Sequence, residues 1–173
     1  MNTVAPQRPS STERAKSALH GALTAQRAHV IGVLEGGDEQ ALRRPVGPFD
    51  WSCLGLVQHL TLDVERFWFR GVVAGELSVT DGEPGSDSWA LAPDATADGV
   101  FAAYRKEIAL ADAVIATTSV ETAPGWWPQD VWGDWRLADL GAVLLHAITE
   151  TACHAGHLDA ARETIDGRRW MVV

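Results

Sequence analysis

Apolar residues recur three and four positions apart in four long segments of the chain, which is the spacing of an amphipathic helix. The predicted helices start at residues 11–12, after residues 50–52, at residues 94–96 and near residue 137, and they end near residues 36, 71–75, 115 and 165. Ser, Thr or Asp residues near three of the starts are typical N-caps, and glycines follow three of the ends. No segment alternates convincingly between apolar and polar residues, so the pattern predicts an all-α fold.

Long connectors separate these predicted helices. They cover residues 38–51, 75–93 and 122–136, and the last of them holds four of the eight tryptophans. Connectors of this length favour a four-helix bundle with long crossover connections over an up-down bundle with tight turns. A short hairpin at residues 81–82 would fit the second connector. We expect residues 1–10 to form a flexible N-terminal tail and residues 11–173 to form a single domain.

Four polar residues share one face of the last predicted helix, within an apolar, Ala-rich stretch. At about 100° per residue, a wedge of roughly 80° holds His146, Glu150, His154 and His157. Polar groups buried on one stripe cost free energy unless they find partners. Glu150 and His154 are four positions apart and could share one metal ion, although a solvated surface pair has the same spacing. A third ligand must come from another helix, and His59 on the second helix is the best candidate.

Charge and composition limit the partners and the compartment. The chain has 14 basic and 23 acidic residues and a net charge of −9, which argues against nucleic acid or an anionic membrane surface as a partner. No run approaches 18 apolar residues, and no signal segment opens the chain. The two cysteines, Cys53 and Cys153, are too few for a disulfide framework. We therefore expect a cytoplasmic protein whose partners are small molecules.

Two segments carry a resemblance to a known family. "WSCLGLVQHL" at residues 51–60 and "ETACHAGHLDAARETIDG" at residues 150–167 resemble signature segments of the DinB-like superfamily, in particular its mycothiol S-transferase-like branch. The resemblance implies a DinB-like four-helix fold and a divalent metal held by His59, Glu150 and His154. Many members have His at the position of Glu150. Glu there is typical of the mycothiol-dependent maleylpyruvate isomerase type, which usually carries a further C-terminal domain, so a chain that stops at Val173 weakens that specific assignment.

Two histidines and a carboxylate with an open fourth position are typical of catalytic zinc, and nickel or iron would also suit these ligands. The resemblance implies that mycothiol, a low-molecular-weight thiol, enters as a metal-bound thiolate and attacks a small electrophile in an S-transfer or isomerisation. His157 is the predicted catalytic residue, in contact with the substrate, although simple polarity at the helix end would also explain it.

Two other functions remain open. The same ligands could activate a water molecule in a hydrolase, with His157 or Asp63 as the general base. Alternatively, the bundle could bind a metal or a partner without catalysis. Bundles of this kind often pair, so a homodimer is compatible with the sequence.

Other polar residues have plainer interpretations. His146 could orient Glu150 from one turn away or be a satisfied histidine at the edge of the core. Cys153 borders the polar stripe, but a free cysteine is most often buried and inert. His20 and His29 have no visible partners and are expected at the surface.

Overall fold

Every named element in the described part of the chain is helical. The computed structural model describes residues 8–80 and 87–170, and within these residues it contains no β-strand. The elements in chain order are α1 (Ser11–Leu34), α2 (Glu39–Arg43), α3 (Cys53–His59), η1 (Leu60–Val73), η2 (Leu77–Val79), α4 (Ala97–Thr117), α5 (Gln129–Trp132) and α6 (Leu140–Asp166). The all-α prediction is therefore confirmed. The predicted hairpin at residues 81–82 and most of the predicted tail lie outside the described residues.

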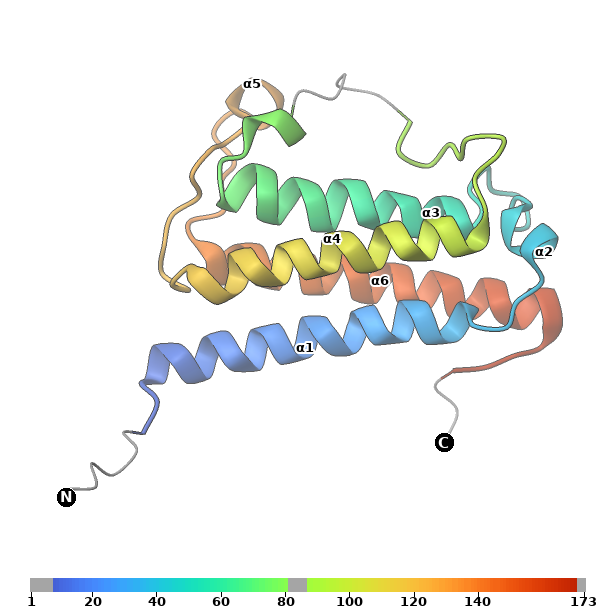
Figure 1. Cartoon of the computed structure of the whole chain (residues 1–173), viewed down its shortest axis with the longest axis horizontal. Helices are drawn as coiled ribbons and strands as arrows, with labels where there is room; N and C mark the ends of the chain where they lie inside the picture. The colour runs from blue at the N-terminus through green and yellow to red at the C-terminus, as the bar shows by residue number, and fades with distance from the viewer. Residues whose placement is uncertain (1–7, 81–86, 171–173) are drawn as a thin grey trace.

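Four long helical segments lie side by side along the molecule (Figure 1). They are α1, the continuous segment α3–η1, α4 and α6. Helix α1 packs along α6, while η1 packs against both α4 and α6. These segments correspond to the four predicted helices. None of the described helices is long and apolar enough to span a bilayer.

Side-chain caps fix where the long helices begin. Ser10 and Glu13 form a capping box at the start of α1, and Ser52 and Thr96 accept hydrogen bonds from the first turns of α3 and α4. Helix α6 begins at Leu140, later than predicted, because Asp139 accepts a hydrogen bond from the backbone N–H of the third residue beyond it.

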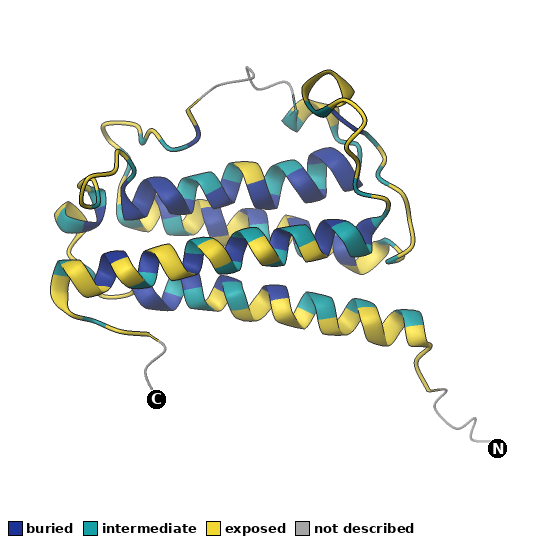
Figure 2. Cartoon of the chain, turned by 180° about the vertical axis from the view of Figure 1, so that it is seen from behind, coloured by how far each residue is buried: buried dark blue, intermediate teal, exposed yellow. Residues whose placement is uncertain are grey.

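The second long segment changes its backbone geometry directly after His59. Residues 53–59 are α-helical, whereas residues 60–73 form wider π-helical turns, and at their end the N–H of Ala74 reaches back five residues to the carbonyl of Phe69. Periodicity predicted one continuous helix and could not show this change. Figure 2 shows that this segment is mostly buried, while the first turns of α1 are mostly exposed.

The connectors contain short helices that the sequence pattern did not predict. These are α2 in the first connector, η2 in the second and α5 in the third. The third connector folds against the end of η1, where the rings of Trp68 and Trp132 stack with their centroids 5.1 Å apart. Trp127 is buried among them. The Trp-rich segment therefore packs largely against its own indole rings and against η1.

Charged residues, some buried and some partly exposed, lie on the side of η1 that faces α1 and α4. We call them the interior ion cluster, and its members are Arg27, Glu65, Arg66, Arg70, Glu107 and Asp112. The guanidinium of Arg27 binds both carboxylate oxygens of Glu65, at 2.7 and 2.5 Å. Glu65 is completely buried. Burial raises the pKa of the Glu65 carboxyl, and its hydrogen bonds with Arg27 oppose this effect.

Candidate metal centre

The three predicted ligands converge between α3 and α6. One ligand atom from each of His59, Glu150 and His154 lies within 4.8 Å of the other two. The side chains of His59 and His154 are 15% and 13% exposed, and that of Glu150 is 39% exposed. The space between these three side chains, called the cleft below, is therefore partly sheltered, and Glu150 is its most exposed ligand.

The spacing of the donor atoms suits a small divalent cation. The Nε2 atom of His154 lies 3.6 Å from the nearer carboxylate oxygen of Glu150, too far for a hydrogen bond. Two ligands at about 2.1 Å from a tetrahedral ion would be separated by roughly 3.4 Å. The imidazole rings of His59 and His154 meet edge to face, with their centroids 5.1 Å apart. Two imidazoles and one carboxylate thus form a donor set that fits zinc or a similar ion.

The electrostatics of the cleft keep His154 in the form that binds metals. Burial, reinforced by the neighbouring His59, lowers the pKa of His154 to about 4, although Glu150 opposes the change. The ring is therefore neutral near pH 7 and offers a lone pair without first losing a proton.

His59 is held by Asp63 on the same helical segment and by Ser88 and Trp89 in the second connector. Its Nδ1 atom lies 2.8 Å from the carboxylate of Asp63, one turn further along the helix, and Ser88 donates a hydrogen bond to the same carboxylate oxygen. Burial alone would raise the pKa of Asp63, but the hydrogen bonds from His59 and Ser88 outweigh it and the pKa is lowered. The indole of Trp89 stacks on the His59 ring at 4.1 Å between centroids.

Sequence reasoning found Asp63 only as a candidate base and did not single out Ser88 or Trp89. The four-residue spacing between His59 and Asp63 could have indicated a hydrogen bond on one helix face. Nothing in the sequence indicates that residues 88 and 89 return to this helix, because that contact depends on how the second connector folds.

The other residues of the predicted stripe lie around the three ligands. His157 is exposed, with its Nδ1 atom 3.4 Å from Nδ1 of His154 and its ring beside Trp51. His146 packs its ring against the edges of Trp68 and Trp135 and makes no hydrogen bond to Glu150 among the described residues. Burial lowers the pKa of His146. The structure therefore favours the core-edge interpretation of His146.

Three smaller predictions need correction. Cys153 is exposed, not buried. His20 lies 2.8 Å from the carboxylate of Asp112, and His29 lies 2.8 Å from that of Asp159. Both histidines therefore have partners on other helices, because α1 packs against its neighbours along faces that the periodicity had assigned to solvent.

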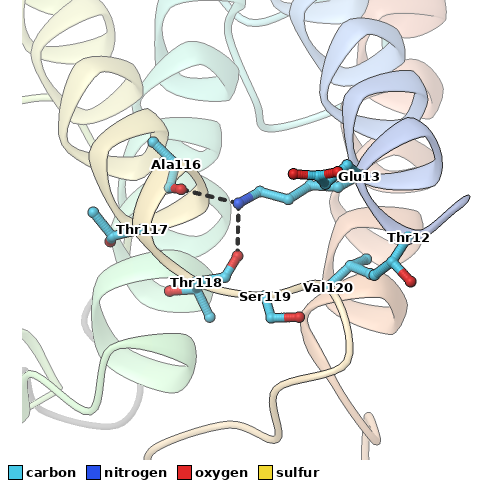
Figure 3. A pocket seen from close by; sticks show the side chains of 8 residues that line it. Thr12, Glu13, Ala116, Thr117, Thr118, Ser119 and Val120 are labelled. Carbon is cyan, nitrogen blue, oxygen red and sulfur yellow. Dashed lines mark hydrogen bonds between the residues drawn. The ribbon is translucent and has the colours of Figure 1, made fainter. Parts of the chain in front are cut away.

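A separate hollow lies between the start of α1 and the end of α4 (Figure 3). Lys16 enters it and donates hydrogen bonds to the backbone carbonyls of Ala116 and Thr118. A lysine at a helix C-terminus satisfies carbonyls that have no partner within the helix. This hollow is thus explained by helix capping, and none of the candidate ligands lines it.

One comparison with known proteins assigns the chain to a family. The family model described as Mycothiol-S-transferase matches residues 18–167, a range that contains all three candidate ligands. No curated protein matches the chain. The matched range runs from the first turns of α1 to the glycine that ends α6. The chain belongs to the mycothiol S-transferase family.

Proposed function

We propose that the protein is a divalent-metal-dependent S-transferase that joins mycothiol to a small electrophile. The observation that carries this proposal is the convergence of His59, Glu150 and His154 on one point, in a chain of the mycothiol S-transferase family. Three protein ligands that leave a coordination position free are typical of catalytic zinc sites. Zinc is the ion that we expect, and nickel and iron are alternatives with the same ligand preferences.

The metal, when bound, would supply a Lewis acid that ionises the thiol of the cosubstrate. A free thiol with a pKa near 8.5 is only about 3% ionised at pH 7, so complete ionisation gains at most roughly 30-fold. Nucleophilicity falls as the pKa of a thiol falls, which removes part of this gain. The larger contribution must therefore come from positioning the electrophile against the sulfur.

Aromatic rings and an exposed histidine flank the three candidate ligands. His157 is exposed one turn beyond His154 and lies next to the ring of Trp51. Trp89 contacts the rings of both candidate histidine ligands, at centroid distances of 4.1 and 5.7 Å. We infer that His157 hydrogen-bonds a substrate, and that the flanking indoles offer flat apolar surfaces to it.

The test is conjugation of a general electrophile by the zinc-loaded protein with and without mycothiol. We expect acceleration only when mycothiol is present. Glu150→Ala should abolish this acceleration and stoichiometric zinc binding. Glu163→Ala is the matched control, since Glu163 lies on the same helix and its carboxylate pairs with Arg169 outside the cleft.

The same assay separates the alternative functions. Turnover of ester or amide substrates without thiol would contradict the transferase and favour a hydrolase. The Oδ2 atom of Asp63 accepts hydrogen bonds from His59 and Ser88, so His157 is the base that we expect for that reaction. Bound zinc with neither activity would contradict both enzyme functions and favour a non-catalytic binding protein.

A further inference from the structure

The candidate metal centre includes a hydrogen-bond network around the Nδ1 atom of His59. Asp63 Oδ2 receives two hydrogen bonds, at 2.8 Å from His59 Nδ1 and at 2.5 Å from the hydroxyl of Ser88. A carboxylate can only accept, so the ring must donate its Nδ1–H to Asp63. A neutral imidazole carries one proton, which leaves the lone pair on Nε2.

The second connector is anchored to α3 at the place where it reaches this carboxylate. The side-chain amide of Gln58 donates hydrogen bonds to the carbonyls of Ser88 and Ala90, at 2.9 and 2.8 Å. At Gly55, a Cβ atom would lie only 2.5 Å from the carbonyl oxygen of Trp89, so this close approach requires glycine. Ser88 is itself buried. The connector is therefore fixed against α3, and the hydroxyl of Ser88 lies next to the carboxylate of Asp63.

His154 offers a contrast within the same cleft. Among the residues that the structure describes, its Nδ1 atom is within hydrogen-bond distance only of the Nδ1 atom of His157, at 3.4 Å, and His157 is exposed. A ring nitrogen facing another ring nitrogen fixes a tautomer less firmly than a carboxylate does, since either ring could donate. The hydrogen bonds that fix the tautomer of a candidate ligand are thus concentrated on His59.

We propose that Asp63 and Ser88 are positioning residues that hold the His59 imidazole as its Nδ1–H tautomer and direct Nε2 into the cleft. Trp89 packs on the face of the ring and limits its rotation. The inference rests on the proposed metal site, and Asp63 acts on it only through His59. In metal sites generally, loss of such a partner lowers metal affinity by about 10–100-fold.

The first test measures zinc affinity by competition with a chelator. Asp63→Ala should lower the affinity by about 10–100-fold, and Asp63→Asn, which keeps an acceptor, should recover part of it. Ser88→Ala should cause a smaller loss in the same direction. Asp159→Ala is the matched control, because it also removes a helical aspartate 2.8 Å from a histidine. Unchanged affinity in Asp63→Ala, or an equal loss in Asp159→Ala, would overturn the proposal.

The second test needs no metal and no activity. Long-range ¹⁵N NMR of the histidine rings in the metal-free protein, at a pH where they are neutral, reports the tautomer directly. We expect His59 as the Nδ1–H tautomer in the wild type and a shift toward Nε2–H in Asp63→Ala. Finding Nε2–H in the wild type would overturn the positioning role. If the wild type shows the Nδ1–H tautomer but binds no zinc, the proposed function fails while the positioning of His59 stands.

Discussion

Two polar clusters share the long segment α3–η1, which contributes residues to both. They differ in how completely their charges are paired. The interior ion cluster faces α1 and α4, and each of its carboxylates contacts at least one guanidinium. The candidate metal centre faces α6 and contains no Lys or Arg among its three ligands. In this centre the Nε2 atom of His154 and the carboxylate of Glu150 lie 3.6 Å apart, which is too far for a hydrogen bond.

The difference separates a role in stability from a role in chemistry. A buried charge is tolerated when partners satisfy it, as Arg27 satisfies Glu65. Imidazole nitrogens and a carboxylate oxygen that converge at one point offer lone pairs that a metal ion can accept. We therefore expect substitutions in the first cluster to change folding stability, and substitutions in the second to change metal binding and activity.

The largest expected effect is the loss of Glu65. Glu65→Ala leaves the guanidinium of Arg27, which is 3% exposed, without its main partner. Removing one member of a buried pair typically costs about 3–5 kcal/mol of unfolding free energy. Chemical denaturation of the metal-free protein measures this cost. Zinc affinity of the folded variant should remain that of the wild type.

A control for Glu65→Ala replaces both partners of the pair. Arg27→Met combined with Glu65→Leu removes both charges and fills the space with apolar groups, so it should recover most of the lost stability. A Glu65→Ala variant as stable as the wild type would contradict a structural role for this ion pair.

The next largest effect is expected at His154, where a substitution should change metal binding and leave folding stability nearly unchanged. His154→Ala removes a candidate ligand, and we expect zinc affinity to fall by more than about 100-fold, since even indirect partners contribute 10–100-fold. The metal-free variant should unfold at nearly the denaturant concentration of the wild type. His20→Ala is the matched control, because it removes a histidine that contacts a carboxylate elsewhere. Equal zinc affinity in His154→Ala and the wild type would exclude the proposed centre.

A smaller effect is expected at the exposed edge of the centre. His157→Ala should retain zinc and lower kcat/KM for thiol transfer by about tenfold, the equivalent of one substrate hydrogen bond of about 1.4 kcal/mol. Steady-state kinetics at saturating mycothiol measure this loss. If the variant loses zinc instead, then His157 acts through His154 and not on the substrate.

The candidate ligands could be proposed from the sequence for reasons that are local. Glu150 and His154 fall on one helix face by their spacing alone. His59 was the best candidate for a third ligand from another helix, and the resemblance to a known family implied the same residue. The four long helices could also be predicted from the sequence, because apolar periodicity and capping residues are signals that lie within a few residues of one another. Gly167, with φ at +76°, is such a signal at the end of α6.

What the sequence did not predict depends on contacts between distant segments. Ser88 reaches Asp63 across 25 residues, and Arg27 reaches Glu65 across 38. Arg and Glu side chains usually face solvent, so nothing in the sequence indicated that Arg27 and Glu65 pair inside the bundle. The π-helical turns after His59 were hidden for another reason, since Leu60, Val64, Trp68 and Val72 are four positions apart, and this spacing also fits an α-helix.

The smallest expected effect tests whether the interior ion cluster is complete without the hydroxyl of Tyr104. Tyr104 is fully buried in the core, and its hydroxyl has no hydrogen-bond partner among the described residues. Burial, together with the charge of Glu65, raises the pKa of this phenol well above its usual value, so the group stays neutral. Tyr104→Phe removes an unpaired buried polar atom and keeps the ring, so unfolding free energy should stay the same or rise by up to about 1 kcal/mol. Chemical denaturation beside the wild type measures the change. A loss of more than about 1 kcal/mol would show that the hydroxyl belongs to the cluster and that its pairing is not complete through the guanidinium groups alone.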